Sequence, residues 1–362
     1  MKIKITHIAL SILLVIPMLI NANTDPKKGK YEKSKAIKKE YKVNADALVK
    51  INNKYGNVDV VSWNENRVVI EVKITVDGND EKRVIAKLDG IDVEFSNSSS
   101  EVSAKTIIEK SSSSWFKLSS SNVNFQIDYK VKMPVTNSAD LVNDYGSISL
   151  NELKGKAKIN CDYGKILIGS LYHTDNSINI DYTSDSNIEF MNTGSINADY
   201  SKLTVEKAKK IDLNADYTTT VIENIEDLSF NCDYGKIQID NGNVIIGNGD
   251  YLTMRFGTVY KKLKIDADYG GIRIDKLKNG FDSVEIDSDY TGIKIGLEPG
   301  ISFDFMVKMS YGGFSYDENN ATFLKKVIKS NDKYYEGYVN DQNSNSTINI
   351  DSEYGSLKMY NN

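Results

Sequence analysis

This 362-residue sequence contains few of the side chains that enzymes most often use for catalysis. It has two histidines, and one of them, His7, lies in an N-terminal segment that we expect to be removed. The other, His173, is predicted to lie solvated in a polar loop. No Ser-His-Asp set, zinc-ligand spacing or phosphate-binding loop is visible. The arginines are Arg67, Arg83, Arg255 and Arg273. The sequence therefore predicts no catalytic, cofactor-binding or metal-binding residues.

Long hydrophobic runs are also scarce. The run from Ile8 to Ile20 is too short to span a bilayer comfortably, because a spanning helix needs roughly 20 apolar residues. Lys2 and Lys4 precede this run and Ala22 offers a cleavage point, so residues 1–22 are predicted to be a secretory signal peptide. The mature chain is then expected to have no transmembrane span and to be exported to the periplasm or the cell surface of a bacterium.

An excess of positive charge is absent as well. Loss of the two charges of Lys2 and Lys4 changes the formal net charge from −5 to −7, and the remaining lysines are dispersed among acidic residues. A chain with this charge is a poor partner for nucleic acid or for an anionic membrane surface.

What the sequence does contain is a repeated phrase built on tyrosine, which Asp precedes in nine of ten copies and Gly, Thr or Ser follows in nine of ten. Ten copies are centred on Tyr145, Tyr163, Tyr182, Tyr200, Tyr217, Tyr234, Tyr251, Tyr269, Tyr290 and Tyr311, with successive spacings of 17 to 21 residues. A period of about 20 residues fits one coil of a β-solenoid in which each coil stacks on the last. We therefore expect an all-β, single-stranded and right-handed solenoid of 17–21 residues per coil.

Apolar residues alternate on both sides of each tyrosine, which predicts two short half-buried strands per repeat. In one copy these are Leu263, Ile265, Ala267, Ile272 and Ile274. The alternation slips by one residue just after the tyrosine, and a continuous strand cannot do this, so a corner is expected there. The glycines that follow the tyrosine are predicted to give the corner its freedom of φ. They are Gly146, Gly164, Gly235, Gly270 and Gly312.

The two cysteines, Cys161 and Cys232, occupy the same inward position of repeats that are four coils apart. At about 4.8 Å per coil they are separated by roughly 19 Å, whereas a disulfide needs Cα atoms within about 7 Å. Both are predicted to be buried free thiols.

The segments before and after the ten copies depart from the repeat. An early copy is centred on Tyr55, with Lys54 in the place of Asp, and residues 62–138 form an excursion from the coil. Strands are predicted in this excursion at 67–76, 91–95, 102–108 and 123–133, with a helix at 80–88. After Gly312, residues 321–329 are predicted to be a short helix and 333–339 a strand, before the phrase returns at Tyr354.

The resulting domain organisation has five parts. They are a signal peptide (1–22), a polar lead-in (23–43), a strand-rich N-terminal cap with α+β and β-hairpin character (44–138), the repetitive solenoid with its tyrosine ladder (139–316), and degenerate coils with a C-terminal cap (317–362). Within the cap, Trp115 and Phe116 lie in a serine-rich joint. They either fold back onto the sheet at a hairpin tip or form a surface contact.

Nine aspartates precede the repeat tyrosines and should form an outward-facing column. They are Asp144, Asp162, Asp181, Asp199, Asp216, Asp233, Asp250, Asp268 and Asp289. In one interpretation each carboxylate accepts the N–H two residues on, as an Asx-turn that fixes the corner. In the other the column recruits Ca²⁺ or a basic partner, but a single file offers few of the six to eight oxygens that Ca²⁺ prefers. We favour the first interpretation and expect no cofactor.

The tyrosines also allow two interpretations. Rings on adjacent coils stabilise a ladder by roughly 0.5 to 1.5 kcal/mol per stacked pair, which is reason enough for their presence. Alternatively, an exposed tyrosine stripe grips sugar rings. Alternation cannot separate the two, because the tyrosine occupies the bend itself.

Three stretches carry a resemblance to a known family: INNKYGNVDVVSW near the start, FQIDYKVKMP in the middle and INIDSEYGSLKMY near the end. With the repeated phrase, they make the chain similar to the exported putative-adhesin domain family. This group of domains of unknown function occurs in Bacteroides- and Flavobacterium-type bacteria and is related to the head domains of auto-transporter adhesins. The resemblance covers nearly everything after residue 40 and implies a β-solenoid at the cell envelope, with no catalytic residues to carry over.

The sequence therefore predicts a non-enzymatic exported scaffold or adhesin that binds an envelope protein or a glycan. A periplasmic accessory protein linked to stress is a variant with a different partner. The alternative is a β-helical carbohydrate-active enzyme, a lyase or hydrolase, which needs two carboxylates or a Lys or Arg base together in one cleft.

Overall fold

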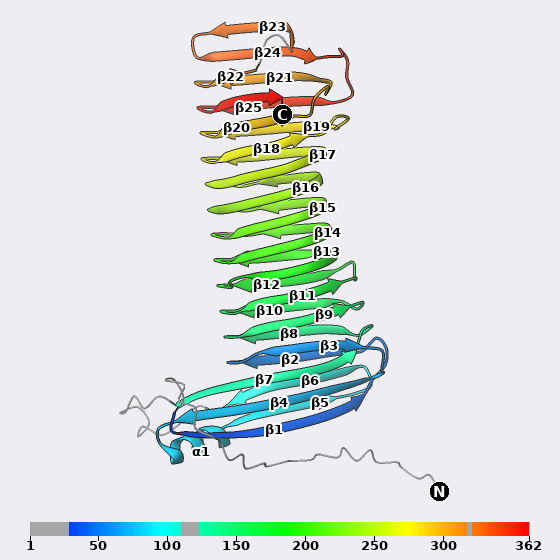
Figure 1. The fold of residues 1–362 in the computed structure, drawn as a ribbon, viewed down its shortest axis with the longest axis vertical. Helices are drawn as coiled ribbons and strands as arrows, with labels where there is room; N and C mark the ends of the chain where they lie inside the picture. The colour runs from blue at the N-terminus through cyan, green and yellow to red at the C-terminus, as the bar shows by residue number, and fades with distance from the viewer. Residues whose placement is uncertain (1–28, 110–122, 317–320, 362) are drawn as a thin grey trace. The chain divides into compact units, whose positions relative to one another are not determined.

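The computed structural model describes residues 29–109, 123–316 and 321–361. The described residues are all-β, as predicted: strands make up 72% of them and they contain a single helix (Figure 1). The chain divides into two compact units, residues 1–171 and 172–362. The predicted signal peptide and the joint with Trp115 and Phe116 lie outside the described residues.

The first unit contains eleven described strands and the helix. They are β1 (Tyr31–Lys42), β2 (Leu48–Lys54), β3 (Val58–Trp63), β4 (Arg67–Gly78), α1 (Glu81–Asp89), β5 (Ile91–Asn97), β6 (Glu101–Ile108), β7 (Val123–Pro134), β8 (Ser138–Asp144), β9 (Ser147–Leu153), β10 (Ala157–Asp162) and β11 (Lys165–Leu171). The strands and the helix predicted within 62–138 are therefore confirmed.

Two kinds of pairing meet in this unit. The repeat strands pair in parallel one repeat apart, so that Ile51, Leu141 and Ile159 are in register on β2, β8 and β10, and all three are buried. The excursion instead contains β4 and β7, which form an antiparallel series with β1 of the lead-in (β1–β4–β7), and the hairpin β5–β6. Helix α1 lies against β4 and β1 and buries Val84. The Asp80 carboxylate caps its first turn by accepting the N–H of Arg83 at 3.3 Å.

The second unit contains the remaining fifteen described strands. They are β12 (Asn176–Asp181), β13 (Ser186–Asp199), β14 (Lys202–Asn214), β15 (Thr219–Asn231), β16 (Gly235–Asn248), β17 (Leu252–Asp268), β18 (Gly271–Leu277), β19 (Ser283–Asp289), β20 (Gly292–Leu297), β21 (Phe303–Ser310), β22 (Gly313–Ser315), β23 (Thr322–Lys329), β24 (Asp332–Val339), β25 (Thr347–Glu353) and β26 (Ser356–Asn361).

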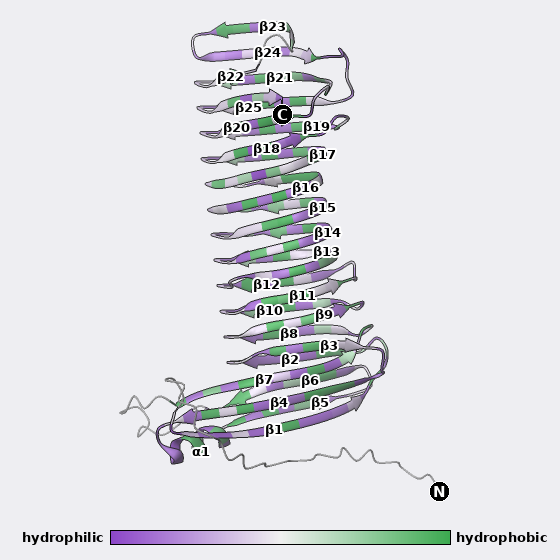
Figure 2. Ribbon diagram, in the orientation of Figure 1, coloured by the Kyte–Doolittle hydropathy of each residue, from purple (hydrophilic) through white to green (hydrophobic). Residues whose placement is uncertain are grey.

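Strands β13 to β17 of this unit pair in parallel with their neighbours in chain order. Equivalent apolar side chains are thereby brought into register and buried. One such row is Ile188, Val205, Ile222, Ile239, Phe256, Ile274 and Ile295. Apolar and polar residues alternate along these strands (Figure 2), as the sequence predicted.

The C-terminal strands of this unit do not follow chain order. Strand β25 pairs in parallel with both β19 and β21, and β26 pairs with both β20 and β22, so the last repeat is inserted between the two before it (Figure 1). Beyond β21 lie β24 and then β23, both antiparallel. The predicted degenerate coil in this segment is therefore wrong.

The predicted helix at 321–329 is wrong as well, because these residues form β23. A turn with Ser330 at a φ of 55° joins β23 directly to β24 in a hairpin. Phe323 then packs edge-on against Phe305, with ring centroids 5.5 Å apart. Leu324 and Ile328 on this strand are 57% and 54% exposed. The strand predicted at 333–339 is confirmed as β24.

Candidate functional site: a half-exposed tyrosine ladder

The corner of every repeat is the tyrosine itself. All twelve repeat tyrosines, including Tyr55 and Tyr354, have a φ between 49° and 63°. This left-handed conformation costs a residue with a Cβ roughly 1 to 2 kcal/mol. The cost is offset locally by a backbone hydrogen bond to the adjacent repeat, as when the Tyr217 N–H donates to the Asp233 carbonyl at 3.0 Å. The predicted corner is confirmed, but it is built by tyrosine.

The glycines after these tyrosines have a different role from the predicted one. None of them has a positive φ. A Cβ added to Gly164 would instead lie 1.9 Å from the carbonyl oxygen of Gly146 in the neighbouring repeat. The same close approach to a neighbouring carbonyl oxygen holds for Gly146, Gly235, Gly270 and Gly312, at 1.8 to 2.4 Å. These positions require glycine because the backbones of adjacent repeats meet there.

The tyrosine rings stack in both units. In the first unit Tyr55, Tyr145 and Tyr163 have centroids 5.0 to 5.1 Å apart. In the second unit nine rings stack at 4.8 to 4.9 Å with interplanar angles of 1° to 6°. Their order in space is Tyr182, Tyr200, Tyr217, Tyr234, Tyr251, Tyr269, Tyr290, Tyr354 and Tyr311. We call these nine rings the tyrosine ladder.

The tyrosine ladder is packed and exposed at the same time. Its rings are 46% to 59% exposed, because each covers the faces of its neighbours while its edge meets solvent. Partial burial, followed by the neighbouring tyrosines and aspartates, raises the pKa of Tyr200, Tyr234, Tyr269 and Tyr354. These four hydroxyls therefore stay protonated at neutral pH and can act as donors. Ladder packing is confirmed, and binding of sugar rings remains a prediction.

Five of the aspartates that precede the tyrosines link repeats instead of closing their own turns. The N–H of Asp216 donates to Oδ1 of Asp199 at 3.2 Å, and the N–H of Asp233 donates to Oδ1 of Asp216 at 3.1 Å. Asp233, Asp250 and Asp268 continue this pattern as acceptors. The predicted Asx-turn is therefore wrong for these five residues. A carboxylate that accepts an N–H is stabilised, which makes a like-charged column tolerable.

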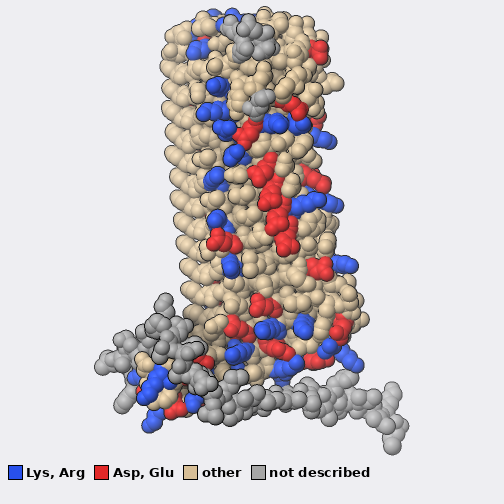
Figure 3. Space-filling view, in the orientation of Figure 1, with Lys and Arg blue, Asp and Glu red and all other residues tan. Residues whose placement is uncertain are grey.

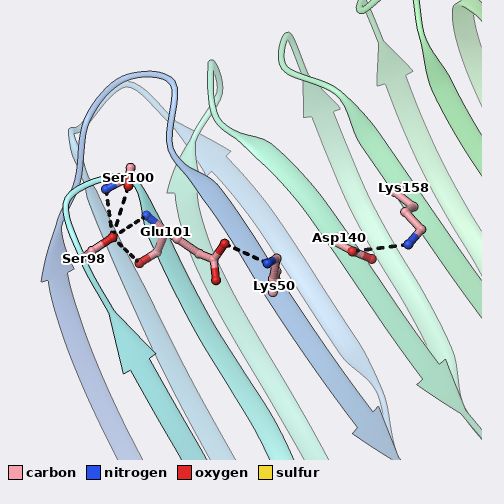
Figure 4. Close-up of polar contacts among 6 residues, drawn as sticks. All are labelled: Lys50, Ser98, Ser100, Glu101, Asp140 and Lys158. Carbon is pink, nitrogen blue, oxygen red and sulfur yellow. Dashed lines mark hydrogen bonds and ion pairs between the residues drawn. The ribbon is translucent and has the colours of Figure 1, made fainter.

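One row of charges on the strands of the first unit alternates in sign, unlike the column of aspartates. Lys50, Asp140 and Lys158 are in register on β2, β8 and β10 and alternate in sign (Figure 4). Lys50 Nζ also lies 2.7 Å from Glu101, and Lys158 Nζ lies 3.5 Å from Asp140. At the corner, Lys54 occupies the aspartate position and pairs with Asp144 at 2.6 Å.

In the second unit, acidic side chains gather in a line over the middle strands of the face seen in Figure 3, with basic ones on either side. A like-charged row is formed by Asp266, Asp287 and Asp351, which are in register on β17, β19 and β25. Burial, and then Asp351 and Asp266, raise the pKa of Asp287.

The residues weighed for chemistry lie apart from the ladder rings. His173 precedes β12, and its Nδ1 accepts the N–H of Asp175 at 3.0 Å. Cys161 and Cys232 are free and buried, as predicted, and burial raises the pKa of each thiol to about 12. Within residues 29–109, 123–316 and 321–361 no group of three or more His, Cys, Asp or Glu side chains is placed to hold a metal ion. The one helix found there is too short to cross a membrane.

One pocket of the second unit does bring two carboxylates together. Asp304 on β21 and Glu336 on β24 line the same cavity of about 310 Å³. The two strands pair antiparallel with Asp304 opposite Tyr338 and Met306 opposite Glu336, so both carboxylates lie on one face of the strand pair. No sequence pattern pointed to this pocket, because it depends on the reordered C-terminal strands.

Comparison with known proteins gives weak likenesses. No family model matches the chain, and no curated protein matches it. Among solved structures it is similar to a putative cell adhesion protein from Clostridium sporogenes, with 11% identity, a TM-score of 0.19, and coverage of 91% of this chain and 100% of that one. It is similar to a putative adhesin from Bacteroides fragilis, with 13% identity, a TM-score of 0.27, and coverage of 90% and 97%.

A third similar structure is a putative lipid binding protein from Parabacteroides distasonis, with 10% identity, a TM-score of 0.33, and coverage of 92% and 98%. Scores this low do not establish a shared fold, so these likenesses carry no argument about function.

Proposed function

We propose that this chain is a non-enzymatic β-solenoid that is exported and acts as a scaffold or adhesin at the bacterial cell envelope. The parallel pairing of repeats 17 to 18 residues apart on β13 to β17 supports the solenoid. The single observation that carries the function is the tyrosine ladder, in which nine adjacent rings are about half exposed. Exposed aromatic rows of this kind occur on monomers mainly where a partner binds.

The geometry of the ladder determines what a partner meets. With centroids 4.8 to 4.9 Å apart, no ligand ring fits between two tyrosines, so the inner faces are closed. The partner instead meets ring edges and hydroxyls, held by stacking in fixed positions. Tyrosine suits such a surface because it offers large contact area at low cost in side-chain entropy. The ladder therefore binds the surface of an envelope protein or the hydroxyl groups of a glycan.

The test compares two pairs of exposed tyrosines in the second unit. The ladder variant carries Tyr217→Ser and Tyr251→Ser, and the control carries Tyr172→Ser and Tyr260→Ser, which are 44% and 40% exposed outside the ladder. The full chain is immobilised and probed with envelope fractions and with a glycan array. We expect the ladder variant to lose at least tenfold in binding while the control binds like the natural protein. Equal binding by both variants contradicts the proposal.

A carbohydrate-active enzyme is the second candidate, and the pocket with Asp304 and Glu336 is the observation in its favour. Two carboxylates on one face are the minimum that glycoside hydrolysis needs. If the chain is such an enzyme, envelope polysaccharides incubated with it should be shortened. The Asp304→Asn and Glu336→Gln variants should then give no shortened products. If the chain is a binding protein only, the polysaccharides should keep their length.

A further inference from the structure

The C-terminal cap of the second unit contains a cavity that is separate from the tyrosine ladder. It measures about 310 Å³ and is open to solvent beside β21, β24 and β25. Its polar lining includes Asp304, Glu336, Gln342, Asn343, Thr347 and Asn349. We propose that this cavity binds one or two rings of a neutral sugar, either free or at the end of a glycan chain.

Asp304 is the first residue that points to a ligand. Its Oδ1 is buried and has no hydrogen-bond partner among the residues that the structure describes. A buried carboxylate oxygen without a donor is costly, and such groups in folded proteins are nearly always satisfied. Thr347 is in register with Asp304, and Asn349 is in register with Met306, so the same face presents further polar groups beside it. A hydroxyl group bound in the cavity can form hydrogen bonds with the polar groups of this face.

Glu336 is already partly engaged, which separates this cavity from a pair of free carboxylates. Its Oε2 accepts the hydroxyl of Tyr334 at 2.8 Å, and this hydrogen bond raises the pKa of Tyr334. Lys325 is in register with Glu336 on β23, and its Nζ lies 4.9 Å from the Tyr334 ring. A positively charged residue therefore lies opposite Glu336 on the neighbouring strand.

The mixture of groups favours a neutral polyhydroxylated ligand. Gln342, Asn343 and Asn349 each present both an amide donor and an amide acceptor, and sugar hydroxyls both donate and accept. A metal ion would face the NH₂ groups of these amides, and an anion would face Asp304. Met306 and Leu324 supply apolar surface for the C–H face of a sugar. The volume lies at the small end of the roughly 300 to 1,000 Å³ typical of ligand pockets, which limits the ligand to one or two rings.

The experiment titrates the full chain with a panel of neutral mono- and disaccharides, with Ca²⁺ and with tetramethylammonium, followed by ligand-observed NMR and calorimetry. We expect saturable binding of at least one sugar. Asp304→Ala and Leu324→Trp should each weaken it at least tenfold, the first by removing the acceptor and the second by filling the cavity from its rim. Asp332→Asn is the control, because it lies on β24 but does not line the cavity.

Folding is checked in the same variants by thermal melting. Asp304→Ala should melt no lower than the natural protein, because it removes an unsatisfied buried oxygen. The ladder variant with Tyr217→Ser and Tyr251→Ser should bind the sugar normally, so failure of this site leaves the ladder proposal standing. Sugar binding accompanied by cleavage supports the site and assigns it to the second candidate function. The absence of sugar binding, unchanged affinity in both cavity variants, or preference for Ca²⁺ or tetramethylammonium overturns the proposal.

Discussion

The two units use the same tyrosine corner but arrange charge in different ways. In the first unit the row Lys50, Asp140 and Lys158 alternates in sign, whereas in the second the row Asp266, Asp287 and Asp351 does not. Parallel in-register stacking places each side chain beside its equivalent in the next repeat. A repeated sequence therefore multiplies any charge it carries, unless the repeats differ at that position. The first of these rows alternates in sign, whereas the second places three aspartates side by side before Lys308 on β21 follows in register with Asp351.

The backbone contact between repeats is common to both units and should give the largest effects. Gly164→Ala places a Cβ 1.9 Å from the Gly146 carbonyl oxygen, so the repeats must separate. We expect a loss of roughly 3 kcal/mol or more in the free energy of unfolding. A Cβ added to Gly271 would meet nothing within 4 Å, and Gly271→Ala should change stability by less than about 1 kcal/mol. Urea unfolding followed by circular dichroism measures the stability of both variants. Similar losses of stability in the two variants contradict the role assigned to Gly164, the close approach of neighbouring backbones.

Ring stacking should give intermediate effects that depend on position in the ladder. Tyr217 stacks on Tyr200 and Tyr234, whereas Tyr311 at the end of the ladder stacks on one ring among the described residues, that of Tyr354. At roughly 0.5 to 1.5 kcal/mol per pair, Tyr217→Ala should cost about twice as much stability as Tyr311→Ala. Tyr217→Gly should recover roughly 1 to 2 kcal/mol relative to Tyr217→Ala by relieving the left-handed φ. Urea unfolding provides the comparison, and equal losses at Tyr217 and Tyr311 contradict the stacking account.

The sequence is sufficient to predict the strands, the buried positions and the corner. Alternation identifies Leu263, Ile265 and Ala267 on one side of Tyr269, and all three are buried. It does not reveal which residue takes the strained backbone conformation, because alternation reports faces and not dihedral angles. Glycine is the usual residue at positive φ, so the sequence predicts for Gly270 the role that belongs to Tyr269. The true reason for Gly270 is the approach of the Leu252 carbonyl oxygen, which only three-dimensional packing reveals.

Contacts between repeats are the second feature that the sequence does not predict. Sequence patterns describe local hydrogen bonds and so predict a partner for the Asp216 carboxylate two residues on, but its partner is the N–H of Asp233. Spacing also counts repeats without ordering them. Tyr354 therefore appears to follow Tyr311, although its ring lies between those of Tyr290 and Tyr311. The cavity beside β21, β24 and β25 is a product of that insertion.

A smaller effect is expected where the first unit places a lysine at an aspartate position. The hydrogen bond from Lys54 to Asp144, followed by the charge of Asp144, raises the pKa of Lys54. A raised pKa means that the folded state favours the charged lysine, so the stabilisation is fully present below pH 10.5 and is lost as the pH rises through the folded pKa. Because the pair is exposed, Lys54→Ala should cost at most about 1 kcal/mol at pH 7. Denaturant unfolding at pH 7 and pH 11 should show this difference shrinking at the higher pH, and a constant difference contradicts the ion pair.

The smallest expected changes in stability have opposite signs in the two units. Asp287→Asn in the second unit removes repulsion from Asp351 and Asp266, and should stabilise by a few tenths of a kcal/mol because the group is exposed. The folded pKa of Asp287 is raised, so the natural protein loses stability as the pH rises from 3.8 through the folded pKa. The advantage of Asn should grow over the same range and then level off. Asp140→Asn in the first unit removes the partner of Lys158 and should instead destabilise by at most about 1 kcal/mol. Thermal melting between pH 3.5 and pH 7 measures both variants. Shifts of the melting temperature with the same sign in both variants contradict the expected difference between the two rows of charges.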